Sequence, residues 1–239
     1  MGTEDDPSVV SEDTLGVVAE RKSWYQQGRT VTVIGLLVAS VIAALVLTNG
    51  LRGRSTTEAS LATERPSQTI KQYLEENRIT SVPIRPGDAE APVITTRLPK
   101  GWSDIAEDTP DWAYGAAQYE KSTADRNDPA TVVFLLSKLT GDVDPARILE
   151  YAPAELNNLP NYEPMAAANS SKLSGFDAIQ LAGRYTRDDK KRTIAQKTVV
   201  IPAEDAVYIL QINADAPDSE SVVLMRATQA IDEQTTITP

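Results

Sequence analysis

Histidine and cysteine are both absent from this 239-residue sequence. Without them the protein cannot form a Ser-His-Asp triad, a cysteine nucleophile or a zinc site built from Cys and His ligands. Disulfides are excluded too, so the core alone must stabilise the fold, and no cysteine can carry a lipid anchor. The sequence also lacks a phosphate-binding glycine loop and a dinucleotide-binding fingerprint. We therefore expect a protein that is not an enzyme and has no cofactor.

Basic residues are in the minority, with 23 Lys and Arg against 34 Asp and Glu and a net charge of −11 at pH 7. This balance disfavours non-specific binding to nucleic acid. The longest basic cluster, Lys190-Lys191-Arg192, directly follows Asp188-Asp189, so the charges largely cancel. We interpret the cluster as the solvated tip of a hairpin and expect no nucleic-acid partner.

One long apolar run stands out at residues 30–51, "TVTVIGLLVASVIAALVLTNGL", which holds 22 residues without a charge. As a helix it would be about 33 Å long, enough to cross a hydrocarbon core of about 30 Å. A cleaved signal peptide is the alternative. The 29-residue hydrophilic lead-in and the lack of a clear small-x-small cleavage site favour an uncleaved signal-anchor instead. Three basic residues flank the run on each side, so charge alone leaves the orientation open.

Composition divides the rest of the chain into three parts. Residues 1–29 are acidic and polar with little apolar periodicity, which is typical of a disordered tail. Residues 52–66 are small and polar and have no hydrophobic face, as in a linker. Residues 67–239 contain periodic apolar segments and are predicted to form one folded domain.

Within this domain, capping signals predict three helices. Ser67 begins the first, Asp144 with Pro145 at the first helical position begins the second, and Asp218 or Ser219 begins the third. The predicted strands are 92–98, 112–119, 131–139, 177–187, 193–202 and 206–214. Short turns join the last three strands, which favours an antiparallel meander. The order αβββαβββα predicts an α+β fold with an antiparallel β-sheet flanked by helices, preceded by one transmembrane helix.

The chain is poor in aromatic residues, yet two of its three tryptophans lie between Leu98 and Tyr119. Four carboxylates share this stretch, but proline disfavours the helix that would align them as a catalytic acid pair. Two interpretations of the aromatics stay open. They close one end of the core, or Trp102, Trp112 and Tyr114 line an apolar cleft and orient a ligand headgroup.

Four motifs occur in order along the domain: Y-L-x-x-N, R-P-G-D-x-x-A-P-V, P-x-G-W and D-T-P-D-x-A-Y-G. With them, the sequence from about Thr69 to Asp232 resembles the LpqN/LpqT family, cell-envelope proteins of mycobacteria and related mycolic-acid actinobacteria. The resemblance implies a Mog1/PsbP-like α/β/α sandwich and a non-enzymatic role outside the cytoplasmic membrane. It also implies binding of a trehalose-type glycolipid and association with an MmpL-type transporter or another envelope protein complex.

Many members of that family are lipoproteins held by an acylated cysteine, whereas here the segment 30–51 takes the place of the lipid. We therefore expect a single-pass anchor in the cytoplasmic membrane, with the N-terminus cytoplasmic and the domain at 67–239 extracytoplasmic. The leading hypothesis is a tethered glycolipid-binding accessory protein for lipid transport. The alternative is a structural or adaptor subunit that docks a membrane protein complex and binds no small molecule.

Overall fold

The computed structural model describes residues 14–15, 68–124 and 128–239. The predicted anchor, the predicted linker and all of the predicted tail except Thr14 and Leu15 lie outside this part of the chain. Within the described residues, no helix is long and apolar enough to span a membrane.

The described residues form the following elements. The helices are α2 (Ile70–Glu76), α3 (Pro145–Asn157) and α4 (Ser221–Gln234), with 3-10 turns η1 (Ala106–Asp108) and η2 (Asp218–Glu220). The strands are β1 (Thr14–Leu15), β2 (Thr80–Ile84), β3 (Val93–Arg97), β4 (Trp102–Asp104), β5 (Gly115–Tyr119), β6 (Thr131–Thr140), β7 (Glu163–Pro164), β8 (Asn169–Leu173), β9 (Phe176–Arg187), β10 (Lys190–Pro202), β11 (Val207–Pro217) and β12 (Thr236–Thr238).

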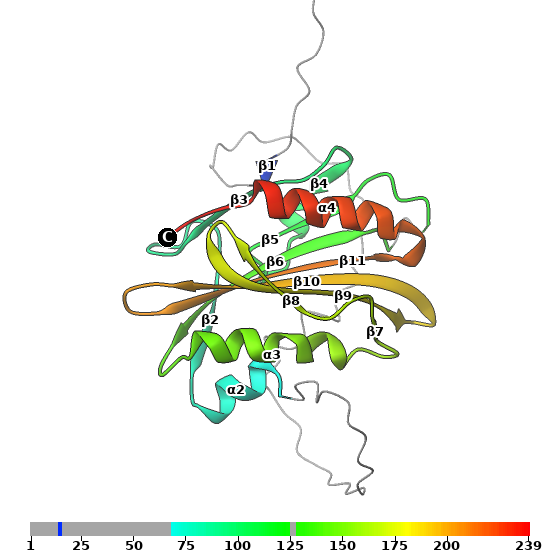
Figure 1. Ribbon diagram of the computed structural model, residues 1–239. Coiled ribbons are helices and arrows are strands. Elements are labelled where there is room, and N and C mark those ends of the chain that lie inside the picture. The colour runs from blue at the N-terminus through cyan, green and yellow to red at the C-terminus, as the bar shows by residue number, and fades with distance from the viewer. Residues whose placement is uncertain (1–13, 16–67, 125–127) are drawn as a thin grey trace, which may run out of the picture.

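Nine of these strands form one antiparallel sheet in the order β4-β5-β6-β11-β10-β9-β7, with β2 also paired to β6 and β8 to β9. Helix α4 covers one face of this sheet, and α2 and α3 lie on the other face (Figure 1). The predicted antiparallel sheet flanked by helices is therefore confirmed. The strand predicted at 92–98, observed as β3, is not part of this sheet. It pairs with β12 and β1 in a separate small sheet.

The predicted helix starts can be compared with the N-caps in the structure. At α3, the Asp144 side chain accepts a hydrogen bond from the backbone N–H of Ala146 and proline occupies the first turn, as predicted. At α2, the predicted cap at Ser67 is wrong, because Thr69 is the N-cap. The Thr69 hydroxyl accepts from the Gln72 backbone N–H at 3.2 Å, and the Gln72 side chain accepts from the Thr69 N–H at 2.8 Å. This reciprocal pair satisfies two backbone donors at the helix end.

The start of α4 also differs from the prediction. Asp218 does not cap the helix, which begins at Ser221. The carboxylate of Asp218 instead accepts hydrogen bonds from the Thr193 hydroxyl and the Arg184 guanidinium, both at 2.8 Å. These bonds lower the pKa of Asp218. The side chain therefore joins η2 to β9 and β10, and a tertiary contact has taken the place of a cap.

The strand predicted at 112–119 is shorter in the structure. A turn occupies its first residues, where the backbone N–H of Ala113 donates to the carbonyl of Pro110 at 2.9 Å, and β5 begins at Gly115. Its partner is β4, in which Trp102 lies opposite Tyr119. The aromatic stretch is thus a short hairpin at one edge of the sheet.

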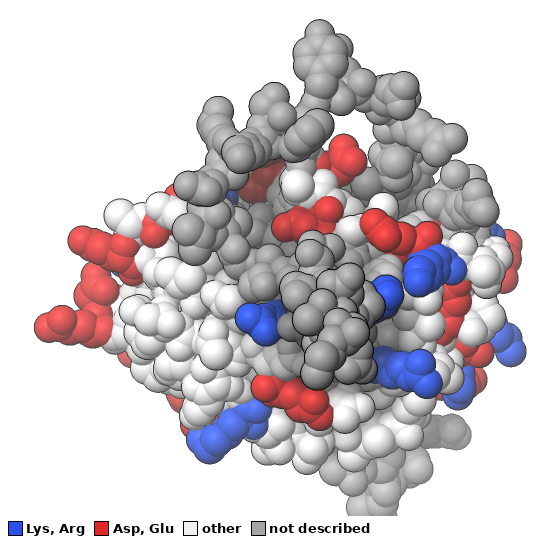
Figure 2. Space-filling model, turned by 90° about the horizontal axis from the view of Figure 1, so that it is seen from above, with Lys and Arg blue, Asp and Glu red and all other residues white. Residues whose placement is uncertain are grey.

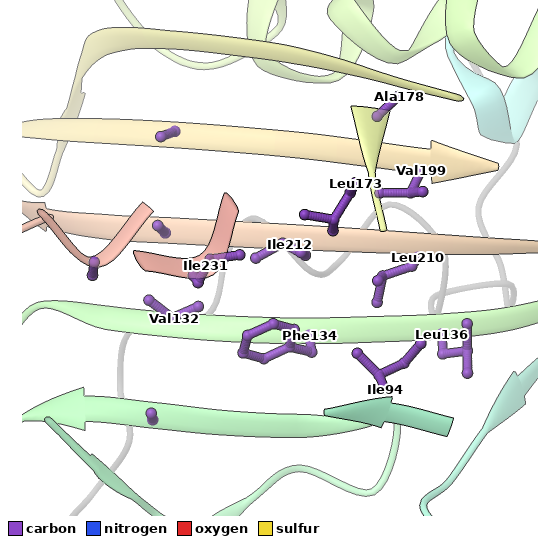
Figure 3. Packing of buried hydrophobic residues seen from close by; sticks show 14 of the residues in the cluster. Ile94, Val132, Phe134, Leu136, Leu173, Ala178, Val199, Leu210, Ile212 and Ile231 are labelled. Atoms are coloured by element: carbon purple, nitrogen blue, oxygen red, sulfur yellow. The ribbon is translucent and has the colours of Figure 1, made fainter. Parts of the chain in front are cut away.

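The main core lies between the sheet and α4. Val132, Phe134 and Leu136 of β6 point to this face, toward Ile231 of α4 and Ile94 of β3 (Figure 3). Side chains alternate along a strand, so Leu135 points to the opposite face. There it is only half-buried, in a small cluster formed by β5, β6 and the turn before β5. A sheet covered on both faces would bury Phe134 and Leu135 equally. Here Phe134 is buried and Leu135 is only half-buried.

Candidate ligand-binding cavity

A cavity of about 820 Å³ lies between α4, the strands β9 to β11 and the segment that leads into β8. Its lining consists of Ala166, Ala167, Ala168, Asn169, Gln180, Leu181, Ala182, Ala195, Gln196, Lys197, Ile212, Ala214, Met225, Thr228, Gln229, Ile231 and Asp232. These residues come from consecutive elements of the chain, from the segment before β8 through β9, β10 and β11 to α4. The cavity is therefore a product of the tertiary fold.

Strand register explains the floor of the cavity. Ala182, Ala195 and Ala214 lie side by side across β9, β10 and β11. Helix α4 passes over this row, and methyl side chains leave unfilled the space that larger residues would occupy in an ordinary core. Further alanines, at 166–168, form a wall of the same cavity.

A second row on the same face carries the polar end of the floor, with Gln180, Lys197 and Ile212 side by side. The Lys197 ammonium lies 2.5 Å from Oδ1 of Asp232 on α4, and the two side chains are 9% and 39% exposed. Among the described residues that line the cavity, these two carry the charges. Gln229 on α4 is held by a 2.8 Å hydrogen bond from its amide to Glu233.

The solvent-exposed lining of the cavity is mixed, because the polar residues Asn169, Gln229 and Asp232 are exposed as well as several apolar ones. The exposed apolar lining residues are Ala166, Ala167, Ala168 and Met225. Exposed Met165 directly precedes Ala166 in the chain. The backbone N–H of Met165 donates to the carbonyl of Ala182 at 2.9 Å, which fixes this segment beside β9. On the face seen from above, acidic and basic side chains lie scattered among uncharged ones (Figure 2). A largely apolar interior with polar groups at its exposed rim suits an amphiphilic ligand.

The aromatic residues predicted to bind a ligand lie elsewhere. Trp102 is 5% exposed in the main core, where its ring lies 5.7 Å from that of Tyr119. Trp112 packs half-buried in the separate cluster with Leu135. The Tyr114 hydroxyl accepts a hydrogen bond from the Ile94 backbone N–H at 3.1 Å. The structure does not bring Trp102 and Trp112 into one cluster, and none of the three predicted residues lines the cavity. Their ligand-binding role stays a prediction.

The carboxylates between Leu98 and Tyr119 support the local chain path. Oδ1 of Asp104 accepts a hydrogen bond from the Ala106 backbone N–H at 2.7 Å, and Asp111 lies 3.7 Å from the Arg85 guanidinium on the surface. Across the described ranges, no group of three or more acidic residues is placed to hold a metal ion.

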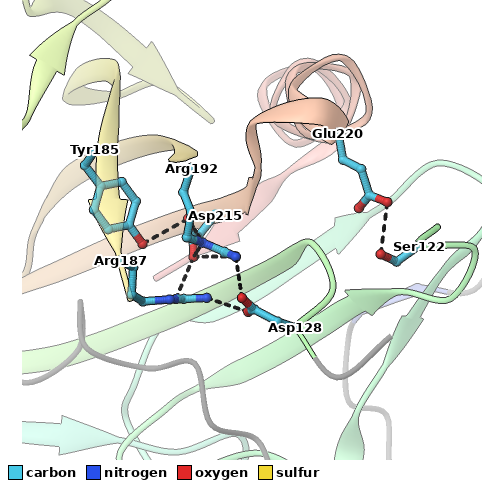
Figure 4. A network of polar contacts seen from close by, with 7 residues as sticks. All are labelled: Ser122, Asp128, Tyr185, Arg187, Arg192, Asp215 and Glu220. Atoms are coloured by element: carbon cyan, nitrogen blue, oxygen red, sulfur yellow. Dashed lines mark hydrogen bonds and ion pairs between the residues drawn. The ribbon is translucent and has the colours of Figure 1, made fainter. Parts of the chain in front are cut away.

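The basic cluster lies at a hairpin tip as interpreted, with residues 188–191 exposed, but the interpretation is wrong for Arg192, which is only 1% exposed. Its guanidinium pairs with Asp215 at 2.9 Å and with Asp128 at 2.6 Å, and Arg187 contacts the same two carboxylates (Figure 4). The Tyr185 hydroxyl donates to Asp215 at 3.2 Å, and burial raises the pKa of Tyr185. Two cations and two anions thus compensate one another inside the protein, which joins β9, β10 and β11 to the segment that enters β6.

A second buried acid lies near this cluster. Oε1 of Glu220, just before α4, accepts hydrogen bonds from the Ser122 hydroxyl at 2.9 Å and from the backbone N–H groups of Thr123 and Ala124 (Figure 4). It fixes the segment after β5 to the start of α4. The sequence contains no local pattern that singles out these acids, because their partners are distant in the chain.

Comparison with known proteins identifies the family of this chain. The pattern of the family described as "Probable lipoprotein LpqN" matches residues 66–238. The chain belongs to the LpqN family. It is 48% identical over 174 residues to Lipoprotein LpqN of Mycobacterium tuberculosis, a match that covers 73% of this chain and 75% of that protein.

One solved structure agrees with this assignment. The crystal structure of LpqN, described as involved in cell envelope biogenesis of Mycobacterium tuberculosis, matches with a TM-score of 0.69 and 47% identity, over 73% of this chain and 99% of that one. The LpqN-like part of the present chain thus corresponds to a unit that folds by itself in its relative. The Ran-binding protein Mog1p of Saccharomyces cerevisiae matches at a TM-score of 0.41 and 12% identity, over 66% of this chain and 95% of that one.

A more distant match is the proline-rich 28 kDa antigen of Mycobacterium tuberculosis. It is 22% identical over 166 residues, which is 69% of this chain and 52% of that protein.

Proposed function

We propose that this LpqN-family chain is a membrane-tethered, non-enzymatic binding protein of the mycolic-acid cell envelope. In this proposal it holds a glycolipid in the cavity beneath α4 and assists an MmpL-type lipid exporter. Family membership supports the envelope role, since the Mycobacterium tuberculosis relative is described as involved in cell envelope biogenesis. The observation that carries the ligand part is the cavity itself.

The cavity has properties that a glycolipid requires. Its volume of about 820 Å³ lies in the range of small-molecule sites. The buried side chains of Ala195, Ala214, Ile212 and Ile231 offer an apolar surface to an acyl chain, while Gln180, Gln229 and the Lys197–Asp232 pair offer hydrogen-bonding groups to a headgroup. Each methylene buried contributes roughly 0.8 kcal/mol, part of which is lost to ordering and desolvation.

The anchor part of the proposal rests on the apolar run at 30–51. A linker of the length of 52–66 spans about 20 Å on average, which keeps the domain near the membrane surface and near an exporter. Thr14 and Leu15 pair with β3 in the structure, whereas an anchored chain would hold them across the membrane. We expect the free energy gained when the apolar run enters the membrane to exceed the free energy lost with this two-residue pairing. A backbone hydrogen bond contributes only about 1 kcal/mol net.

The ligand proposal is tested by organic extraction of purified residues 66–239 and mass spectrometry of the extract. Ala182→Phe places a ring in the floor of the cavity and should abolish lipid recovery. Ala203→Phe, in the exposed turn between β10 and β11, is the matched control and should leave it unchanged. Equal recovery from both variants would exclude the cavity. A lipid-free protein that captures one membrane complex would support the adaptor alternative.

Orientation is tested in the intact chain. Alkaline phosphatase fused after Pro239 folds to an active enzyme only outside the cytoplasm, so the proposal predicts an active fusion. An inactive phosphatase fusion together with a fluorescent cytoplasmic reporter would reverse the orientation.

A further inference from the structure

The ion pair in the cavity has an unusual location. Lys197 lies in the floor on β10, and its side chain is 9% exposed. A buried ammonium group is costly without a counter-charge, so Lys197 requires a negative partner in every state of the cavity. Asp232 supplies that partner from the facing helix, and its carboxylate is 39% exposed.

The position of Asp232 in α4 is locally unfavourable. It lies in the last turn of the helix, where the partial negative charge of the helix end disfavours a carboxylate. No basic residue lies in that turn to compensate it. Lys197, across the cavity, is therefore the contact that offsets this cost, and the two residues make the cavity electrically neutral.

Neutrality has a consequence for the ligand. A headgroup without charge can form hydrogen bonds beside the pair and leave it intact. An anionic headgroup that approaches Lys197 lies next to the Asp232 carboxylate, and in a partly dehydrated site the repulsion between the two negative charges opposes its binding. The cavity thus rejects anions even though it contains a lysine.

We propose that Asp232 is a specificity-determining residue, a built-in counter-ion that occupies Lys197 and excludes anionic amphiphiles in favour of uncharged ones. This inference rests on the proposed function, because it concerns the ligand of the same cavity. Removal of the Asp232 charge frees Lys197 for an external anion and reverses the preference.

The test compares two probes with the same chain, decyl maltoside and decyl phosphate, each below its critical micelle concentration. Binding to residues 66–239 is measured by titration calorimetry. Wild type should bind decyl maltoside roughly tenfold more tightly than decyl phosphate, and Asp232→Asn should favour decyl phosphate by a similar factor. Asp205→Asn is the matched control, because Asp205 pairs with Lys138 at 3.5 Å on the surface, outside the cavity.

Recovery of thermal stability on addition of decyl phosphate supplies a readout that a merely structural ion pair would not show. Asp232→Asn leaves Lys197 without its partner and should lower the melting temperature, and decyl phosphate should restore it in this variant more than in wild type. Should Asp232→Asn fail to fold, the wild-type preference decides: equal or tighter binding of decyl phosphate would overturn the inference. Binding of both probes with unchanged preference in Asp232→Asn would overturn the inference and leave the proposed function intact. Failure of both probes to bind wild type would overturn both.

Discussion

Glu155 of α3 and Ile70 of α2 are joined by a buried hydrogen bond, in which the backbone N–H of Ile70 donates to Oε1 of Glu155 at 3.1 Å. The carboxyl group thus satisfies a backbone donor in the first turn of a neighbouring helix. Burial raises the pKa of Glu155 to about 7, and the hydrogen bonds from α2 oppose this rise only in part. The contact therefore connects the packing of the two helices to pH.

This relationship predicts a pH dependence of stability. The folded-state pKa is about 7 and the ordinary value is 4.5, so the folded protein binds more protons than the unfolded chain between these values. Its stability should then fall as pH rises from 4.5 to 7, by about 3 kcal/mol. Glu155→Gln should remove this dependence and be more stable than wild type at pH 8. Urea unfolding at pH 5 and pH 8 measures both effects. Exposed Glu150→Gln is the control, and an equal pH response in wild type and Glu155→Gln would contradict the prediction.

The burial of Arg192 predicts a large difference between adjacent cations. Arg192→Met leaves Asp128 and Asp215 with only one of their two cations and should cost about 3–5 kcal/mol. Lys191→Met, one position away on the exposed side of the same strand, should change the free energy of unfolding by less than about 0.5 kcal/mol. Chemical denaturation of the two variants measures the contrast. Similar changes in the free energy of unfolding for both variants would support the original interpretation, in which Arg192 is solvated at the hairpin tip.

The two faces of β6 should also respond differently to truncation. Phe134 is 3% exposed in the main core, so Phe134→Ala should cost about 3–5 kcal/mol. Leu135 is half-buried in a smaller cluster, and Leu135→Ala should cost less than about 2 kcal/mol. Thermal unfolding of the pair checks this order. A larger loss in Leu135→Ala would mean that another layer covers that face.

The tryptophans report where a ligand binds. Neither Trp102 nor Trp112 lines the cavity, so a single-chain trehalose glycolipid that binds there should leave their fluorescence unchanged while calorimetry detects the binding. Trp102→Phe should lower the melting temperature, since Trp102 is a core residue, and should not alter the affinity. A ligand-induced change in emission that disappears in Trp102→Phe or Trp112→Phe would return the binding site to the aromatic hairpin.

Local signals were sufficient where the interacting groups are close in the chain. Asp144 and Pro145 begin α3 as predicted, because a cap needs only the next turn of backbone. The long strands β6, β9, β10 and β11 could be recognised from their apolar runs, and the short turns between the last three predicted their antiparallel pairing. The start of α4 predicted at Asp218 or Ser219 is wrong, because distant Arg184 and Thr193 bind the Asp218 side chain and the helix begins at Ser221.

The sequence by itself determined the α+β class, the antiparallel meander and the motifs that resemble the LpqN family, all of which depend on residues within about a dozen positions of one another. Only the tertiary structure decided which residues surround a cavity and which charges are buried. Alternation places Ala182 and Ala195 on one face of their strands, but the chain alone does not state that α4 passes over that face and leaves a space. The burial of Arg192 likewise depends on Asp128 and Asp215, which approach it only when β6, β10 and β11 assemble. Long-range strand order sets both features, because it determines which faces and charges meet.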